Sequence, residues 1–286
     1  MVSAARLVTG GNGVTSQLER MRLKPVHSKQ KISLRDADAH PPRHAPSGDK
    51  LEALTEELTT RIAELQRVFY ADARHALLIV LQGRDASGKD GTIRHVFRAV
   101  NPQACDVTSF KVPTEAERSH DFLWRIHQRV PPRGVIGIFN RSHYEDVIVD
   151  RVHGTMSKRV YSSRYDQIND FERMLAENGV VILKFFLHVS RDEQRRRLQD
   201  RLTDETKNWK FRVGDLDDRA LWKPYTHAYR DALRACSKRH APWFVVPSDD
   251  KDVRNWLIAR TIADTLDGLD LRYPPASAAV RSLEIK

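Results

Sequence analysis

The chain has 286 residues, of which 40% are hydrophobic and 30% charged, so it can build one sizeable α/β domain with short extensions but not a second full domain. Its formal net charge of +10 predicts attraction to a polyanion such as nucleic acid, a membrane surface or a phosphate chain, and charge alone does not choose among them. No run of about eighteen apolar residues occurs, so we expect no membrane-spanning helix.

The two cysteines, Cys105 and Cys236, lie far apart and form no CxxC, so they predict neither a disulfide framework nor a zinc site. We interpret both as small core residues in a reducing compartment. The N-terminus lacks the apolar core of a secretory signal, and we therefore expect a cytoplasmic protein.

Residues 1–48 are rich in Gly, Ser, Pro, Lys and Arg and show no hydrophobic period, which predicts a basic, mostly irregular and loosely docked extension. Its first acidic residue is Glu19. Such a start is typical of a transit peptide, or of an upstream start codon with Met21 as the working initiator, and we favour the second. Residues 273–286 are expected to form a C-terminal tail.

Between residues 49 and 272, helical periodicity alternates with short apolar runs, which predicts βαβ units on a parallel sheet and hence an α/β fold. Four runs are expected to be strands: Ala76–Leu81, Val135–Phe139, Val180–Val189 and Trp243–Val246.

Amphipathic helices are expected between these strands. Their predicted extents are Leu54–Phe69, a phosphate-side helix through Ile93, Val96, Phe97 and Val100, Thr114–Gln128, a helix that stops at Gly179, a helix that opens at Ser190, and a closing helix from about Asp250 to Leu266. Thr114 with Glu117 and Ser190 with Glu193 have the spacing of capping boxes.

A glycine-rich segment, Gly83-Arg-Asp-Ala-Ser-Gly-Lys-Asp-Gly91, follows the first strand directly and precedes a helical pattern, which is the context of a P-loop. Such a loop turns backbone N–H groups toward a phosphate, and Lys89 can reach the transferred group. A glycine-rich turn with a surface lysine is the weaker alternative. The candidate phosphate-binding positions are Gly83, Arg84, Ala86, Ser87, Gly88, Asp90, Gly91 and Thr92.

Asp90 departs from the ordinary P-loop pattern, in which a Ser or Thr hydroxyl contacts magnesium at this position. Carboxylates at Asp85 and Asp90 make best sense if a divalent cation intervenes between them and phosphate. We select Asp85 as the metal-side or acceptor-orienting residue. For Asp90 we favour the simpler interpretation, an acidic residue that suits a helix N-terminus.

The second strand ends in Asn140-Arg-Ser-His143-Tyr-Glu145-Asp146, at the carboxyl edge of the sheet where open α/β folds bind ligands. Arg141 suits bidentate phosphate binding, with a salt-bridged loop as the alternative. His143 is interpreted as a hydrogen-bonding residue. Because Asn140 replaces the usual acid, magnesium would take its charge from Asp85 or from Glu145 and Asp146.

A predicted helix after the third strand is strongly basic; its arginines are Arg191, Arg195, Arg196, Arg197 and Arg201. A basic stripe is usually only a solvated face. In P-loop kinases, however, helices after this strand form a lid whose arginines neutralise charge on the transferred group. We therefore expect a lid over about residues 191–225, with Arg197, Arg201, Lys207 and Lys210 as its phosphate-binding candidates.

Taken together, these motifs resemble the second family of polyphosphate kinases, particularly its class III. The matching stretches cover about residues 49–272: Gly83–Ile93, His120–Arg125, Gly137–Val147, Lys207–Phe211 and Ala241–Pro247. The resemblance implies a thymidylate-kinase-like, three-layer P-loop kinase fold with a mobile helical lid. It also implies reversible transfer from inorganic polyphosphate to adenine nucleotides, and a homo-oligomer, either a dimer or a tetramer.

Carried over by position, the resemblance makes Asp85, Lys89, Arg141 and Arg201 catalytic or phosphate-binding. It implies Mg²⁺, with Mn²⁺ as an alternative, on Asp85 and Glu145. Tyr144-Glu145-Asp146 is similar to members that accept both AMP and ADP, whereas members with Tyr-Asn-Arg favour ADP. Asn140 is shared with class III and leaves the metal ligands open.

Two rival functions remain at this point. An ATP-dependent nucleotide or small-molecule kinase would use the same fold, but Asp90 and the large positive surplus speak against it. A nucleic-acid binder would use the basic helix but would leave the P-loop unexplained, so we expect neither a nucleic-acid nor a membrane partner.

Overall fold

The computed structural model describes residues 21–27 and 32–285. Five parallel strands form one sheet in the order β2-β3-β1-β4-β5. Their bounds are β1 Ala76–Gln82, β2 Cys105–Ser109, β3 Ile136–Asn140, β4 Val180–His188 and β5 Trp243–Pro247. Because β1 is the central strand, the loop that follows it lies between the ends of β3 and β4.

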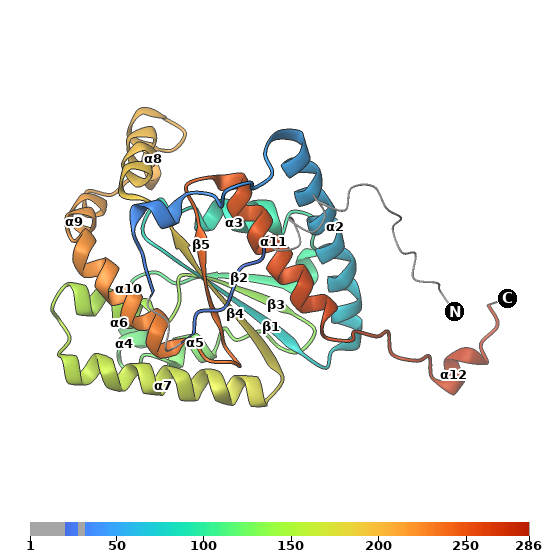
Figure 1. Cartoon of the computed structure of the whole chain (residues 1–286). Coiled ribbons are helices and arrows are strands. Elements are labelled where there is room, and N and C mark those ends of the chain that lie inside the picture. The colour runs from blue at the N-terminus through green and yellow to red at the C-terminus, as the bar shows by residue number, and fades with distance from the viewer. Residues whose placement is uncertain (1–20, 28–31, 286) are drawn as a thin grey trace.

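Helices cover both faces of the sheet (Figure 1). One face packs on α2 (Gly48–Asp72), α3 (Lys89–Val96) and α11 (Lys251–Asp267). The other packs on α5 (Trp124–His127), α6 (Glu145–Val152), α7 (Lys158–Glu177) and α10 (Trp222–Cys236). Every residue of β1 is buried, as expected of a central parallel strand with both faces covered. The expected three-layer α/β architecture is confirmed.

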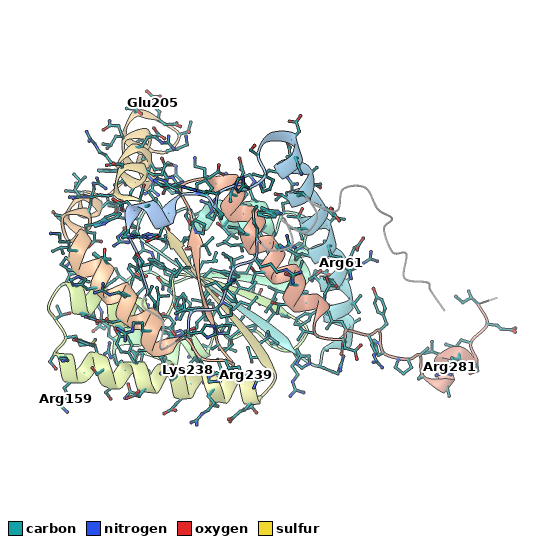
Figure 2. The ribbon with its side chains drawn as sticks, in the orientation of Figure 1. Arg61, Arg159, Glu205, Lys238, Arg239 and Arg281 are labelled. Atoms are coloured by element: carbon teal, nitrogen blue, oxygen red, sulfur yellow. The ribbon has the colours of Figure 1, made fainter. Side chains whose placement is uncertain are left out.

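The remaining elements lie around these layers. They are η1 (Asp36–Ala39), η2 (Pro102–Ala104), α4 (Glu115–Arg118), α8 (Arg191–Thr203), η3 (Asn208–Lys210), α9 (Gly214–Ala220) and α12 (Ala278–Arg281). Charged side chains such as Arg61, Arg159 and Glu205 are exposed on the surface (Figure 2). Among the described residues, no helix is both long and apolar enough to cross a bilayer.

The four predicted strands are confirmed to within a residue or two at each end, but β2 was not predicted. Its sequence, Cys-Asp-Val-Thr-Ser, has no apolar run, and all five of its residues are exposed or half-buried. β2 is the edge strand beside β3, so burial does not demand an apolar sequence there.

The single helix predicted over Thr114–Gln128 is wrong, because two short helices, α4 and α5, occupy this segment. The capping box at its start is confirmed: Thr114 accepts from the Glu117 N–H, and Glu117 accepts from the Thr114 N–H. Asp121 then accepts a hydrogen bond from the Leu123 N–H at 2.9 Å. This side chain offers the backbone a turn in place of a continuous helix.

Other helices differ from expectation in extent. α2 begins six residues earlier than predicted and ends at Asp72, and its C-cap residue Ala73 adopts the left-handed conformation with φ +48°. α3 ends at Val96, although Phe97 and Val100 remain in the core. α6, α9 and α10 were not predicted.

The described part of the N-terminal extension is packed on the domain, contrary to the expected loose docking. Val26 donates a backbone hydrogen bond to Trp243 at 2.8 Å, and Pro25 pairs with Phe244, so the segment covers the open edge of β5. Ile32 and Leu34 are buried in the core. The segment has too few apolar residues to show a hydrophobic periodicity in the sequence. Val26, Ile32 and Leu34 are nevertheless buried against the domain. Met21 is among the described residues. The prediction that Met21 is the working initiator concerns residues 1–20, which lie outside them.

Candidate active site

The phosphate loop joins β1 to α3 and has the strand–loop–helix context that the sequence predicts. Two glycines make its conformation possible. Gly83 has φ +155°, and a Cβ there would lie 2.7 Å from the Leu187 carbonyl oxygen. Gly88 has φ +105°, and a Cβ there would overlap the guanidinium of Arg254. Only glycine therefore satisfies both the backbone and the packing at these positions.

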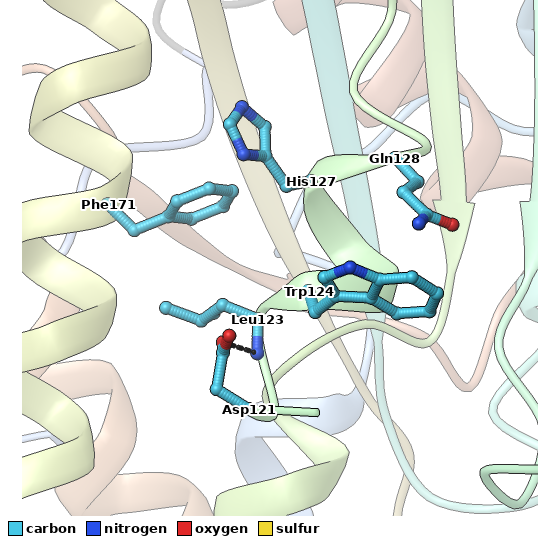
Figure 3. Close-up of a pocket in the computed structure, with 6 residues that line it drawn as sticks. All are labelled: Asp121, Leu123, Trp124, His127, Gln128 and Phe171. Carbon is cyan, nitrogen blue, oxygen red and sulfur yellow. Dashed lines mark hydrogen bonds between the residues drawn. The ribbon is translucent and has the colours of Figure 1, made fainter. Parts of the chain in front are cut away.

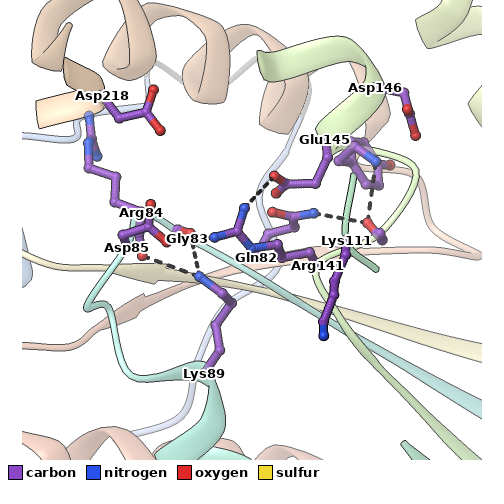
Figure 4. Close-up of polar contacts among 12 residues, drawn as sticks. Gln82, Gly83, Arg84, Asp85, Lys89, Lys111, Arg141, Glu145, Asp146 and Asp218 are labelled. Atoms are coloured by element: carbon purple, nitrogen blue, oxygen red, sulfur yellow. Dashed lines mark hydrogen bonds and ion pairs between the residues drawn. The ribbon is translucent and has the colours of Figure 1, made fainter. Parts of the chain in front are cut away.

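Lys89 opens α3 and is buried beneath the loop. Its Nζ donates to the carbonyl oxygens of Gly83, at 2.7 Å, and Arg84, at 3.3 Å (Figure 4). Burial, and then repulsion from Arg141, lower the pKa of this ammonium to about 8. The lysine is thus held at the loop by neutral acceptors rather than by a carboxylate.

Arg141 joins two carboxylates from different parts of the chain (Figure 4). Its Nη2 lies 2.6 Å from Asp85 Oδ1, and its Nη1 lies 3.2 Å from Glu145 Oε2. Glu145 raises the pKa of the guanidinium most, and Asp85 adds to the shift. Arg141 has φ +65°, an uncommon left-handed conformation for a large residue. The structure therefore brings the predicted Asp85, Arg141 and Glu145 together beside Lys89.

Glu145 lies against Gln82, a residue the sequence analysis did not select. With the Gln82 amide nitrogen facing Glu145 Oε1 at 2.8 Å, the amide oxygen accepts from the Ser142 hydroxyl and N–H. Burial raises the pKa of Glu145. Gln82 is the last residue of β1, and its polarity at the end of an apolar strand was the available signal.

Asp90 links the loop to the neighbouring strand and to the basic segment after α8. Its carboxylate accepts from Asn140 Nδ2 at 2.8 Å and lies 3.5 Å from Lys210 Nζ. Asn140 therefore occupies the strand end as predicted, but it donates to Asp90. We expected Asp90 to be only an acidic residue that suits a helix N-terminus. It also contacts Asn140 and Lys210.

Two of the predicted site residues in the turn after β3 contact protein groups away from the phosphate loop. His143 is buried, with Nε2 3.3 Å from Glu172, because its side chain faces the core behind β3. Both carboxylate oxygens of Asp146 accept hydrogen bonds from Arg125, at 3.0 and 3.2 Å. His143 therefore forms its expected hydrogen bond inside the core rather than at the phosphate loop. Asp146 is corrected from a candidate source of charge for magnesium to a partner of Arg125.

Arg84 is also buried: its guanidinium lies over the Trp222 ring at 3.9 Å and donates to Thr226. Arg197 turns toward the back of the loop and donates to the Ala86 and Ser87 carbonyl oxygens. These two side chains are committed to protein groups, so direct phosphate contact by either is corrected as well. Ser87 and Thr92 are buried with hydroxyls that lack a partner in the described residues, while Gly91 lies in the first turn of α3.

The first half of α8 is fixed to the loop, since Gln194 donates to the Asp85 carbonyl oxygen at 3.0 Å. Ser190 caps α8 by accepting from the Glu193 N–H, but the Glu193 carboxylate pairs with Arg196 and Arg197, so the reciprocal half of the predicted capping box is absent. Arg191 and Arg195 are exposed.

The remaining lid candidates lie farther along this segment. Arg201 is 3.7 Å from Asp215, Lys207 pairs with Asp204, and Lys210 lies over the Trp209 ring at 5.0 Å. Of these three cations, Lys210 has the contact to the loop through Asp90.

A separate hollow lies between α5 and α7 and is lined by Asp121, Leu123, Trp124, His127, Gln128 and Phe171 (Figure 3). Its lining contains neither lysine nor arginine. The hollow therefore does not suit a phosphate chain, and the phosphate loop remains the candidate site.

The sequence was compared with families of known proteins, and the polyphosphate kinase 2 family model matches residues 46–273. The chain belongs to this family. The AMP/ADP-polyphosphate phosphotransferase of Meiothermus ruber is 52% identical over 236 residues, or 82% of this chain and 88% of that protein. The ADP-polyphosphate phosphotransferase of Rhodopseudomonas palustris is 43% identical, over 77% and 81% of the two chains.

The crystal structure of polyphosphate kinase 2 from Arthrobacter aurescens TC1 is similar to this one, with a TM-score of 0.85 and 40% identity over 90% of this chain and 93% of that one. Fold and sequence thus agree on the family. As a member of the polyphosphate kinase 2 family, the chain is an enzyme, a phosphotransferase.

Polyphosphate kinase activity implies a divalent metal. Among the described residues, no group of three or more His, Cys, Asp or Glu could hold one. Asp85 and Glu145 nevertheless both lie within 3.2 Å of one guanidinium, so their oxygens face a common space. They fit a hard cation that takes one or two protein carboxylates and completes its shell with phosphate oxygens and water.

Proposed function

We propose that the chain transfers phosphoryl groups reversibly from inorganic polyphosphate to AMP and ADP, forming ADP and ATP. The observation that carries the proposal is the convergence of Lys89, Arg141, Asp85 and Glu145 around the phosphate loop. The family and the names of the relatives in Meiothermus ruber and Rhodopseudomonas palustris support polyphosphate as the donor.

The reaction is an in-line displacement, in which an oxygen of the acceptor nucleotide's terminal phosphate attacks the terminal phosphorus of polyphosphate. One P–O bond forms and the bond to the shortened chain breaks, without a covalent enzyme intermediate. Lys89 and Arg141 offset the charge on the transferred group, and Arg201 approaches from the proposed lid over about residues 191–225.

Asp85 and Glu145 change partner during this cycle in our proposal. Without substrate, both hold Arg141. When phosphate occupies the loop, Arg141 turns toward it. Asp85 and Glu145 would then be the residues that hold Mg²⁺, which would supply positive charge to offset that of the phosphate groups. Mn²⁺ has the same oxygen preference and can substitute.

Glu145 supports AMP as an acceptor in addition to ADP. It is half-buried and contacts Arg141 and Gln82 beside the phosphate loop. The Meiothermus ruber relative is named for both nucleotides, and the Rhodopseudomonas palustris relative for ADP.

The acceptor assignment is tested by chromatography of nucleotides formed from Mg²⁺, long-chain polyphosphate and either AMP or ADP. We expect ADP and then ATP from AMP, and ATP from ADP. In a Glu145→Asn variant, we expect the rate with AMP to fall more than the rate with ADP. Product from ADP alone in the unaltered protein would keep the polyphosphate reaction and overturn AMP as an acceptor.

Two further properties complete the proposal. We place the enzyme in the cytoplasm, where adenine nucleotides and reduced thiols such as Cys105 and Cys236 coexist. We also propose a homo-oligomer, a dimer or a tetramer, which size-exclusion chromatography with light scattering would measure.

A further inference from the structure

Two buried guanidinium groups contact the backbone of the phosphate loop. Arg197 comes from α8 and Arg254 from α11, and they are 7% and 2% exposed. Both donate to the same acceptor, the carbonyl oxygen of Ser87, at 3.2 and 3.3 Å. Arg254 was not selected from the sequence, because 167 residues separate it from its partner in the loop.

This shared contact sets the direction of a backbone donor. In a trans peptide, the C=O and the following N–H point in opposite directions. With the Ser87 carbonyl drawn back toward the two arginines, the N–H of Gly88 points to the opposite side, toward the mouth of the loop. Ala86 and Gly88, with φ +62° and +105°, have the left-handed backbone that this orientation requires.

The two arginines differ in how their charge is balanced. Arg197 pairs with Glu193 at 2.7 Å. Arg254 donates its other hydrogen bonds to the neutral Asn255 Oδ1, at 3.0 and 3.2 Å. Within residues 21–27 and 32–285, no carboxylate forms an ion pair with Arg254. The guanidinium instead packs against Gly88, where an added Cβ would overlap it.

A buried cation without a direct ion-pair partner is unfavourable in the unliganded protein, although the carboxylates of Asp252 and Asp250 offset part of its charge from a distance. It is buried, it lies near Arg197, and it faces the N-terminal end of α3, which carries a partial positive charge. Burial, and then Arg197, lower the pKa of Arg254 to about 9, so the side chain still carries its charge at neutral pH. A phosphate bound on the other side of the loop would offset this repulsion.

We propose that Arg254 is a positioning residue of the phosphate loop, which increases the affinity of the loop for phosphate by its charge and by its hold on the Ser87 carbonyl. It does not touch the substrate. Because it attracts the bound anion in the ground state and in the transition state alike, it acts on binding rather than on the chemical step. The identity of the anion rests on the proposed function.

The test compares Arg254→Gln, which keeps hydrogen-bonding groups but removes the charge, with Arg254→Lys, which keeps the charge. Arg260→Gln, six residues along the same helix and beside the Trp256 ring, is the matched control. Isothermal titration with inorganic tripolyphosphate measures binding. Steady-state rates with polyphosphate and ADP measure KM and kcat.

We expect Arg254→Gln to raise both the tripolyphosphate Kd and the KM for polyphosphate about tenfold, with kcat changed less than about threefold. The melting temperature without ligand should be unchanged or higher, because a buried charge without a direct ion-pair partner is gone. Arg254→Lys and Arg260→Gln should stay within about threefold of the unaltered Kd.

Two results would overturn the proposal: a Kd within twofold of the original in Arg254→Gln, or a lower melting temperature with an unchanged ligand-induced shift, which would mark Arg254 as a packing residue. The failure of the proposed function is distinguishable from these results. If the proposed function fails, the unaltered protein will form no nucleotide from polyphosphate. The tripolyphosphate Kd would still test whether Arg254 increases the affinity of the loop for phosphate.

Discussion

Lys89 and Arg141 lie at the same site but keep their charges by different means. Arg141 has two carboxylate partners, which raise its pKa. Lys89 has only carbonyl partners in the loop, and burial lowers its pKa to about 8. Of the two cations, Lys89 is therefore the one that can lose its charge in the range where enzymes are assayed.

This difference predicts how activity depends on pH. The protonated form of Lys89 is the one that attracts phosphate, so kcat/KM should fall as the pH rises through about 8. Bound phosphate favours the ammonium, so kcat should fall only at higher pH. Rates with polyphosphate and ADP between pH 6.5 and 9.5 measure both profiles.

A Lys89→Arg variant is the control, because a guanidinium keeps its charge over this range. Its kcat/KM should be lower overall but should lack the fall near pH 8. Lys89→Ala should reduce kcat on the order of 10²-fold, as expected for a group that stabilises developing charge. A kcat/KM in the unaltered enzyme that is flat or rising from pH 7 to 9 would contradict the role of Lys89.

At the scale of elements, the turn from β3 to α6 is supported from behind by β4, α7 and α10. Lys184 on β4 is paired with Glu172 on α7 and donates to the Tyr144 hydroxyl at 2.9 Å and the Cys236 carbonyl oxygen at 2.7 Å. Tyr144 donates to Glu172 at 2.9 Å. Because Tyr144 directly precedes Glu145, this buried network fixes the turn that carries Arg141 and Glu145.

The network predicts a large loss of stability when its charge balance is broken. Glu172→Gln leaves the Lys184 ammonium buried without its counter-ion, which should lower the free energy of unfolding by about 3–5 kcal/mol. Urea denaturation followed by fluorescence measures the loss. Adding Lys184→Met should recover part of it, since no buried charge then remains. If the losses of unfolding free energy in Glu172→Gln and Lys184→Met simply add in the double variant, the two residues are not coupled.

The same elements show what the sequence could predict. Apolar runs revealed β1, β3, β4 and β5, and the glycine-rich loop revealed the site, because both signals are local. β2 has no apolar run, since it is an edge strand, and the Asp121 turn divides a segment that looks like one helix. Their positive charge made Arg84 and Arg197 candidates for phosphate binding. Only the tertiary structure shows that both side chains donate their hydrogen bonds to protein groups instead.

At the scale of the whole molecule, the order of the strands assembles the site. β1 lies directly beside β3, so Asp85 and Arg141, which are 56 residues apart, meet at one edge of the sheet. β4 lies on the other side of β1 and leads into α8, which holds the loop through Gln194 and Arg197. This strand order therefore places the phosphate loop between two elements. On one side is the turn after β3, which carries Arg141 and Glu145, and on the other is the basic helix α8.

In our proposal, this site uses polyphosphate as its phosphoryl donor. The most direct test compares two initial rates in Mg²⁺: ATP formation from polyphosphate and ADP, and ADP formation from ATP and AMP without polyphosphate. We predict that the first is faster by at least on the order of 10²-fold, because the loop, Arg141 and the basic segment serve an extended phosphate chain. Transfer from ATP to AMP at an equal or higher rate, with polyphosphate inert, would contradict polyphosphate as the donor and select an ATP-dependent nucleotide kinase.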